Sequence, residues 1–452
     1  MTSPQLTGAD RPEVADPPPW SFPLPQHHRL SNGIPVVLHH LPGQHVISTT
    51  VLIDHSLANE PAEHEGITAM AARLLTEGTQ AHPGERFAEL LDNNGAAMGH
   101  QLSTDGLQIL MDVPTTNLAP ALDLVAEAVL GPELSPGDVN RHKELRLAEI
   151  AQLEAHSAGL ASREFRRRVL SDTDRAGRPN GGDRDQVASL TPELVRDWAD
   201  SLLRPEHTTI VIGGDLGATE ADRDALLALL EARFGTWTGP HAPITHPDLH
   251  PGRPGCTVID RPGAVQADLR IGGWGIDRSD PRWPGIRVAS HAVGGGFNSR
   301  LNTVLREEKG FTYGIRLGFT PQRSGGWFTT SGSFRTEVVG EAMSLAREIL
   351  AAPDDITAAE VVDAQRYLTG ITALQYATAD AVVDQTSLQL MMGLPDDYLT
   401  RAQEALVAVD ADAATTAYRE IVDPDRLTCV IVGDAEALVP QLTDAGFDPQ
   451  VA

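Results

Sequence analysis

The sequence repeats itself at a fixed spacing, and this repeat limits the possible folds more than any other feature. Residues 204–215, RPEHTTIVIGGD, resemble residues 423–434, DPDRLTCVIVGD. The segment GITAMAARLL from Gly66 and the segment GIRVASHAVG from Gly285 show the same offset of 219 residues. Two independent matches at one offset predict two copies of a single domain. Length alone would favour about three domains for a chain of this size.

Hydrophobic patterning predicts similar secondary structure in both copies. Apolar or alternating runs predict strands at 34–40, 47–55, 107–113 and 208–214, and again at 256–260, 265–273, 327–334 and 427–434. Amphipathic segments between the strands predict helices at 85–95, 119–131 and 192–203. We therefore expect an α+β protein made of two homologous domains related by internal duplication, each a β-sheet covered on one face by helices.

The domain boundary falls in a segment rich in Pro, Gly and His. This segment, GPHAPITHPDLHPGRP, is the natural linker at residues 239–254. We place the N-terminal domain at 25–238 and the C-terminal domain at 255–452. Residues 1–24 are polar and Pro-rich, which predicts a disordered lead-in. They contain neither the basic region nor the apolar region of a secretory signal, so we expect a cytoplasmic protein.

The charge balance limits the possible partners. The chain has 35 Lys and Arg against 62 Asp and Glu, which gives a formal net charge of −27. Such a chain repels phosphate, so we do not expect it to bind nucleic acid. No run of about 18 apolar residues occurs, so no membrane span is expected. The two cysteines, Cys256 and Cys429, form no C-x-x-C motif and cannot build a thiolate zinc site.

Residues 66–79, GITAMAARLLTEGT, resemble the metal-site helix of the pitrilysin/insulysin family of zinc peptidases, the inverzincins. In that family the helix carries H-x-x-E-H between a Gly-Leu start and a Gly-Thr end. The resemblance places Ala69 and Arg73 at the two histidine positions and Ala72 at the general-base position. Glu149 lies 76 residues after Arg73, where the family has its third ligand, a glutamate. We call these four residues the degenerate metal site.

The degenerate metal site lacks the side chains that this chemistry needs. Two imidazoles and a carboxylate hold Zn²⁺, and the glutamate between the histidines deprotonates the metal-bound water. Two alanines and a guanidinium can do neither, so the resemblance implies no cofactor in this chain. We expect Arg73 and Glu149 to meet as an ion pair. The helix itself is expected to be a core element with Ile67, Met70 and Leu74 facing inward.

The most specific motif of the chain is GGGFNSRLNTVLREEKGFTYGIR, residues 294–316. A tight turn is expected at its three glycines, Gly294, Gly295 and Gly296. A helix follows and ends at Gly310. Arg306 is expected in the last turn of this helix and Tyr313 at the start of the next strand, so their side chains can converge. Both side chains donate hydrogen bonds, which suits them to hold a peptide carbonyl and the oxyanion that develops on it.

The motif is open to two other interpretations. Arg306 could be an exposed arginine favoured by the helix dipole, and Tyr313 an unrelated core residue. A Gly-rich loop before a helix could also cradle phosphate. No Lys-Ser or Lys-Thr follows the loop, however, and the acidity of the chain opposes phosphate binding.

The same motif resembles the C-terminal half of the pitrilysin/insulysin peptidases, where an Arg and a Tyr seven residues apart bind the substrate. Some bacterial and mitochondrial relatives consist of two subunits, one with H-x-x-E-H and one with the Arg/Tyr pair. Over residues 27–440 this chain resembles the second kind. The resemblance implies a heterodimer with a homologous zinc-bearing subunit. Arg306 and Tyr313 would then act in trans on an extended peptide, and the three glycines would help to bind it.

Two further functions stay open. One is a peptide-binding or scaffold subunit without proteolysis, like the core subunits of respiratory complexes that resemble these peptidases. The other is an enzyme with an active site of its own that no motif reveals, since the sequence contains no G-x-S-x-G, no P-loop and no H-E-x-x-H.

Overall fold

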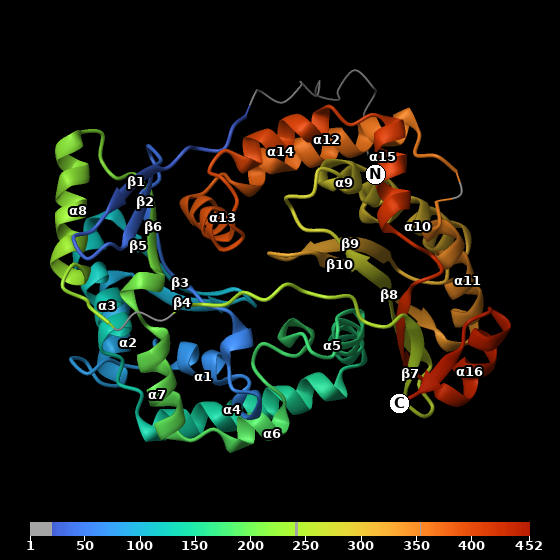
Figure 1. Cartoon of the computed structure of the whole chain (residues 1–452), viewed down its shortest axis with the longest axis horizontal. Helices are drawn as coiled ribbons and strands as arrows, with labels where there is room; N and C mark the ends of the chain where they lie inside the picture. The colour runs from blue at the N-terminus through green and yellow to red at the C-terminus, as the bar shows by residue number, and fades with distance from the viewer. Residues whose placement is uncertain (1–19, 240–242, 353) are drawn as a thin grey trace, which may run out of the picture.

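The computed structural model describes residues 20–239, 243–352 and 354–452. The strands of the first half are β1 (Gln26–Arg29), β2 (Pro35–His40), β3 (Val46–Asp54), β4 (Ala97–Leu102), β5 (Gly106–Pro114) and β6 (Thr208–Gly214). Those of the second half are β7 (Gly255–Asp260), β8 (Gln266–Gly275), β9 (Ile315–Pro321), β10 (Gly326–Arg335), β11 (Thr428–Gly433) and β12 (Pro449–Val451). Each half forms one sheet (Figure 1).

The two sheets confirm the duplication in five of their six strands, while the edge strands β1 and β12 do not correspond. The first has the order β1-β2-β6-β3-β5-β4, and the second has the order β12-β7-β11-β8-β10-β9. β2 with β6 and β7 with β11 are parallel, and the pairs β3–β5 and β8–β10 are antiparallel, but β1 is antiparallel to β2 whereas β12 is parallel to β7. All eight predicted strands are present. The strand expected to start at Tyr313 is β9, and the three strands that were not predicted, β1, β4 and β12, lie at sheet edges.

Helices fill the connections between the strands in the same order in both halves. The first half has α1 (Ile67–Leu74), α2 (Glu85–Asn94), α3 (Leu118–Leu130), α4 (Pro136–Ala155), α5 (Ser157–Val169), α6 (Arg184–Ser189), α7 (Pro192–Leu202) and α8 (Glu220–Phe234). The second half has α9 (Trp283–Ser290), α10 (Arg300–Asn302), α11 (Val339–Leu350), α12 (Ala358–Gln375), α13 (Ala379–Met391), α14 (Tyr398–Val407), α15 (Ala411–Ile421) and α16 (Ala435–Asp444). The three predicted helices correspond to α2, α3 and α7. In the described ranges, no helix combines the length and hydrophobicity needed to cross a membrane.

Each sheet is covered on one face by helices of its own half, as expected. In the first half Phe87, Leu122 and Leu230 of α2, α3 and α8 are buried in the core beneath the sheet. In the second half Met343 of α11 and Leu438 of α16 lie in the corresponding core. These two apolar layers provide most of the hydrophobic stabilisation of the fold.

The other face of each sheet receives a helix from the opposite half, which the sequence did not predict. α5 packs on β8 and β11, and α13 packs on β3 and β6 (Figure 1). Leu160 contacts Val432 in one of these interfaces. Val383 packs with Val37 and Val211 in the other. Because each half supplies part of the other's core, the halves cannot separate without exposing buried apolar surface.

The expected disordered lead-in is wrong for its last residues. Phe22 is 3% exposed and makes edge-on ring contacts with Tyr376, at 5.5 Å between centroids, and with His39. Trp20 stacks on Tyr376 at 5.8 Å. Two aromatic side chains bury enough apolar area to order this short polar segment. The rest of the predicted lead-in, residues 1–19, lies outside the described residues.

His246, in the segment predicted as a linker, contacts two carboxylates of the first half. His246 Nε2 lies 3.0 Å from Asp54 Oδ1, and Nδ1 lies 3.3 Å from Asp105 Oδ1. Arg323 of the second half reaches the same Asp54 oxygen at 3.6 Å. His246 and Asp54 thus join the connecting segment, the first sheet and the β9–β10 turn in one charged cluster.

The charged cluster around His246 predicts that the free energy of unfolding decreases at alkaline pH. Asp105 and then Asp54 raise the pKa of His246 from 6.5 to about 9. A folded-state pKa above the unfolded value means that the stabilisation is fully present below pH 6.5 and is lost as pH rises through 9. His246→Gln should therefore lower the melting temperature at pH 6 and have little effect at pH 10. An equal loss at both pH values would contradict the charged role of His246.

Candidate functional site

The degenerate metal site lies between α1 and α4, and a salt bridge closes it. Arg73 donates from Nη1 to Glu149 Oε1 at 2.8 Å and from Nη2 to Oε2 at 2.7 Å, a bidentate pair. Arg146 adds a bond to Oε2 at 3.1 Å. Hydrogen bonds from Arg73 and then Arg146 lower the pKa of Glu149. The predicted pairing of Arg73 with Glu149 is therefore observed, and it uses both carboxylate oxygens.

The residues of this site do not fit a zinc ion. Ala72 is fully buried and Ala69 partly exposed, and neither can donate to a metal. Both oxygens of Glu149 already accept from guanidinium groups. Three protein ligands are the usual minimum for catalytic zinc. Within the described part of the chain, no three His, Cys, Asp or Glu side chains are placed to hold a metal together.

The purified chain is expected to contain far less than one zinc per molecule, even after dialysis against zinc. The positive control is the double variant Ala69→His/Arg73→His, which supplies two imidazoles and frees Glu149. This variant should bind about one zinc per chain, because three ligands are then available. Elemental analysis of both proteins provides the measurement. Stoichiometric zinc in the wild type that disappears in Glu149→Ala would refute the interpretation.

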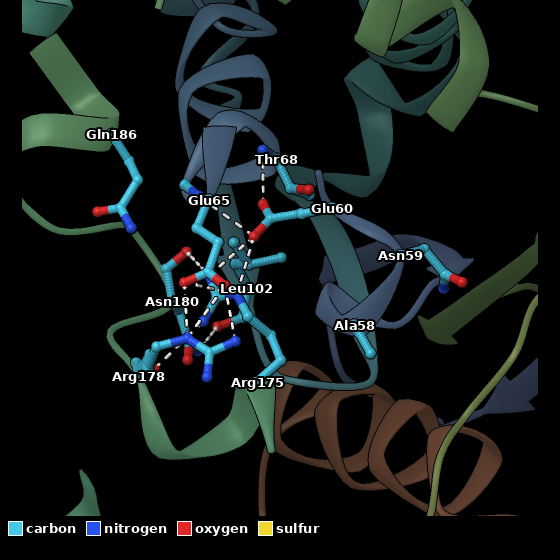
Figure 2. Close-up of polar contacts among 12 residues, drawn as sticks. Ala58, Asn59, Glu60, Glu65, Thr68, Leu102, Arg175, Arg178, Asn180 and Gln186 are labelled. Carbon is cyan, nitrogen blue, oxygen red and sulfur yellow. Dashed lines mark hydrogen bonds and ion pairs between the residues drawn. The ribbon is translucent and has the colours of Figure 1, made fainter. Parts of the chain in front are cut away.

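The N-terminus of α1 is held by a buried ion-pair network that the sequence did not reveal (Figure 2). Glu60 Oε1 accepts from the Thr68 backbone N–H at 3.0 Å, and Oε2 accepts from that of Gly66 at 3.2 Å. Arg175 Nη2 donates to the same Oε2 at 2.8 Å. The side chain of Glu60 is 0% exposed and that of Arg175 is 4% exposed. Glu60 therefore caps the first turn of α1 with its charge fully compensated.

A second pair extends this network to the edge of the first sheet. Arg178 donates to Glu65 through Nη2 at 2.7 Å and through Nε at 2.9 Å. Asn180 donates to the carbonyl of Leu102, the last residue of β4, at 3.2 Å. The backbones of Gly66 and Gly181 approach closely here, because a Cβ atom on Gly66 would lie 2.6 Å from the Gly181 carbonyl carbon. The network thus fixes α1 relative to the edge strand β4.

The Gly-rich segment at residues 294–296 does not form the tight turn that was expected there. None of its three glycines has a positive φ, so the tight turn predicted for that reason is wrong. Gly294 is buried, and a Cβ there would lie 2.6 Å from Leu301 Cδ1 and 2.6 Å from Leu317 Cβ. Close packing of a π-helical turn (His291–Gly295) on β9 therefore explains why Gly294 lacks a side chain.

Arg306 and Tyr313 lie on one solvent-facing segment but do not touch each other. Arg306 belongs to a π-helical turn, and its guanidinium lies over the ring of Phe297, 3.9 Å from the centroid. Gly310 ends this turn with φ of +62°, as predicted. Tyr313 is 100% exposed in a bend before β9, so the alternative that it is a core residue is wrong. Among the described residues no hydrogen bond involves the Tyr313 hydroxyl, which leaves it available.

Phe297 is the residue at this site that sequence analysis did not single out. It is 70% exposed, although aromatic residues are usually buried. Its ring face holds the Arg306 guanidinium by a cation–π contact. The signal in the sequence was an aromatic residue directly after three glycines.

Comparisons with known proteins agree with these observations. The chain is 25% identical over 358 residues to an uncharacterized zinc protease of Mycobacterium tuberculosis, covering 76% of this chain and 79% of that protein. It is 22% identical to the protein named non-peptidase homolog YmxG of Helicobacter pylori, covering 73% and 76%. A crystal structure of a peptidase M16 inactive domain from Pseudomonas fluorescens has the same fold. Its TM-score is 0.80 at 23% identity, and the match covers 91% of this chain and 98% of that one.

Two models of one family match most of the sequence. Residues 35–177 match the insulinase family, peptidase family M16, and residues 189–368 match the peptidase M16 inactive domain. The first match contains β2 to β5 together with α1 and α4, and the second match contains β6 to β10. The chain therefore belongs to the insulinase family of peptidases, M16.

Proposed function

We propose that this chain is the zinc-less subunit of a cytoplasmic, heterodimeric M16 peptidase. In this role it supplies Arg306 and Tyr313 to the active site of a homologous partner that carries H-x-x-E-H. The contrast between the two halves carries the proposal. Arg73 occupies both oxygens of Glu149 in the first half, whereas Tyr313 is fully exposed and Arg306 partly exposed in the second. Similar proteins that are named a peptidase M16 inactive domain and a non-peptidase homolog support it.

The chemical role of the two side chains is to stabilise charge on the substrate. Hydrolysis itself requires the metal-bound water of the partner. The Arg306 guanidinium and the Tyr313 hydroxyl donate hydrogen bonds to a peptide carbonyl, and these bonds strengthen as that oxygen becomes negative. The Phe297 ring orients the guanidinium in advance, so less conformational entropy is lost when the peptide binds.

The substrate of this subunit is an extended peptide. Among the described strands β9, which follows Tyr313, pairs only with β10, so its other edge can accept an added strand. A folded protein cannot present such a strand without unfolding. Among the three glycines, Gly295 and Gly296 are partly exposed, and we assign main-chain contacts with the peptide to them.

Photo-crosslinking tests this assignment in the assembled pair. A benzoylphenylalanine placed at position 313 should crosslink to a bound peptide in the presence of the partner. The same group at Val265, which is 79% exposed at the start of β8, is the matched control and should not. If the pair assembles and neither position crosslinks, the result contradicts the peptidase role and favours the scaffold function.

A further inference from the structure

The second half contains a cavity at the place that corresponds to the degenerate metal site. Its volume is about 480 Å³, and α9, β9, α12 and α14 contribute to its walls. His291, at the end of α9, lies 219 residues after Ala72 and so occupies the equivalent position of the repeat. Its ring stacks on Tyr367 of α12 at 4.7 Å. The cavity is therefore the counterpart, in the second copy, of the site at which the first copy resembles a metal centre.

The charge of this cavity is positive and is not neutralised. Arg278, Arg287 and Arg316 all line it. None of the three forms an ion pair with a carboxylate in the described ranges, whereas Arg73 and Arg175 of the first half are both paired. Arg278 Nε is buried without a hydrogen-bond partner. Burial and then the neighbouring Arg278 lower the pKa of Arg287.

Arg278 and Arg287 are partly buried, and their unpaired guanidinium groups cost free energy unless something neutralises them, whereas Arg316 is exposed to solvent. The whole chain has 62 acidic residues against 35 basic ones. It therefore offers many carboxylates, yet none of those in the described ranges pairs with these arginines. A guanidinium group presents a planar fork of donors that matches a carboxylate. The missing counter-charge is thus expected to come from a ligand.

The open edge of β9 indicates what kind of ligand brings that charge. Among the described strands β9 pairs only with β10; Ile315 gives its N–H to Asn302 Oδ1 at 3.1 Å, and beyond it Arg316 and Gly318 line the cavity. A peptide that adds to this edge would place alternate side chains over the cavity. We propose that this cavity is a subsite for acidic side chains, Asp or Glu, of an extended peptide lying along β9. The inference rests on the proposed peptide-binding function and specifies the class of substrate.

Calorimetric titration of the full chain tests the subsite with two peptides. Both are nine residues long, acetylated and amidated, so that only side chains carry charge. One has Glu at alternate positions and the other has Gln there. The Glu peptide should bind at least about tenfold more tightly, because hydrogen bonds to charged groups are the stronger ones. Equal affinity for the two peptides would overturn the inference, as would the absence of binding by both.

Variants of the cavity arginines separate binding from folding. Arg287→Gln should weaken the Glu peptide about tenfold and leave the Gln peptide unchanged. Its melting temperature should stay equal or rise, since the variant removes a partly buried charge without a partner. Arg335→Gln, an exposed arginine at the end of β10, is the matched control and should change neither affinity. If Arg287→Gln leaves the Glu-peptide affinity unchanged, the subsite is refuted.

The same experiment keeps this inference distinct from the proposed function. Turnover by the reconstituted pair is measured on both peptides. If the pair cleaves both equally and both bind with equal affinity, the acidic subsite is wrong and the peptidase role stands. If the Glu peptide binds through Arg287 and neither peptide is cleaved, the subsite stands and the proposed catalytic role fails.

Discussion

Arg306→Ala is expected to lower the turnover of the reconstituted peptidase pair by about 10²–10³-fold, the usual effect of losing one oxyanion donor. Tyr313→Phe should act in the same direction, because it removes only the hydroxyl. Both side chains are at the surface, so neither change should disturb folding. The measurement is the kcat of the mixture of this chain with the H-x-x-E-H subunit.

The control for this prediction lies three residues away. Lys309 pairs with Glu341 on the surface, and Lys309→Ala removes a positive charge from the same segment. This variant should keep turnover within about twofold, since an exposed ion pair contributes little. Gel filtration should show each variant in a heterodimer. If Arg306→Ala and Tyr313→Phe both assemble and cleave like wild type, the chain is a scaffold or a lid.

Breaking the buried network at α1 should destabilise the protein by about 3–5 kcal/mol, as measured when one partner of a buried ion pair is removed. In Glu60→Gln the carboxylate is lost, and Arg175, 4% exposed, keeps a buried charge without its main partner. The N–H groups of Gly66 and Thr68 lose a charged acceptor as well. We expect the urea midpoint to fall sharply.

A surface pair provides the comparison for this stability prediction. Arg86 and Glu89 form an exposed bridge on α2, with side chains 56% and 61% exposed. Glu89→Gln should change the free energy of unfolding by at most about 0.5 kcal/mol. Equal effects of Glu60→Gln and Glu89→Gln would show that the network at α1 does not hold the helix in place.

Much of the fold was predictable because the sequence repeats its apolar pattern. The central strands were found in both copies, since continuous buried runs such as 208–214 carry a strong signal. Edge strands gave a weak signal because they are short or half exposed: β12 spans only Pro449–Val451, and β4 buries little. α5 packs on the sheet of the second half, and α13 packs on the sheet of the first half. These contacts join residues that are far apart in the sequence, so local hydrophobic periodicity cannot predict them.

The candidate site was predictable where a motif fixed the register. The resemblance to the metal site of the pitrilysin/insulysin family implied that Arg73 and Glu149 lie together, and they do pair. Glu60 and Arg175 are 115 residues apart and match no motif, so their pairing could not be foreseen. Tyr313 was expected to open a strand, but β9 begins at Ile315, and the residue lies in the preceding bend. This placement increases its exposure.

The central claim is that peptide cleavage needs two different chains. The most direct measurement compares the turnover of an extended peptide by this chain alone, by the H-x-x-E-H subunit alone, and by their equimolar mixture. We predict that the mixture cleaves at least about 10²-fold faster than either chain, because the proposed function puts the oxyanion donors and the metal-bound water on different subunits. Cleavage by this chain alone at the rate of the mixture, or by the partner alone at that rate, would contradict the claim.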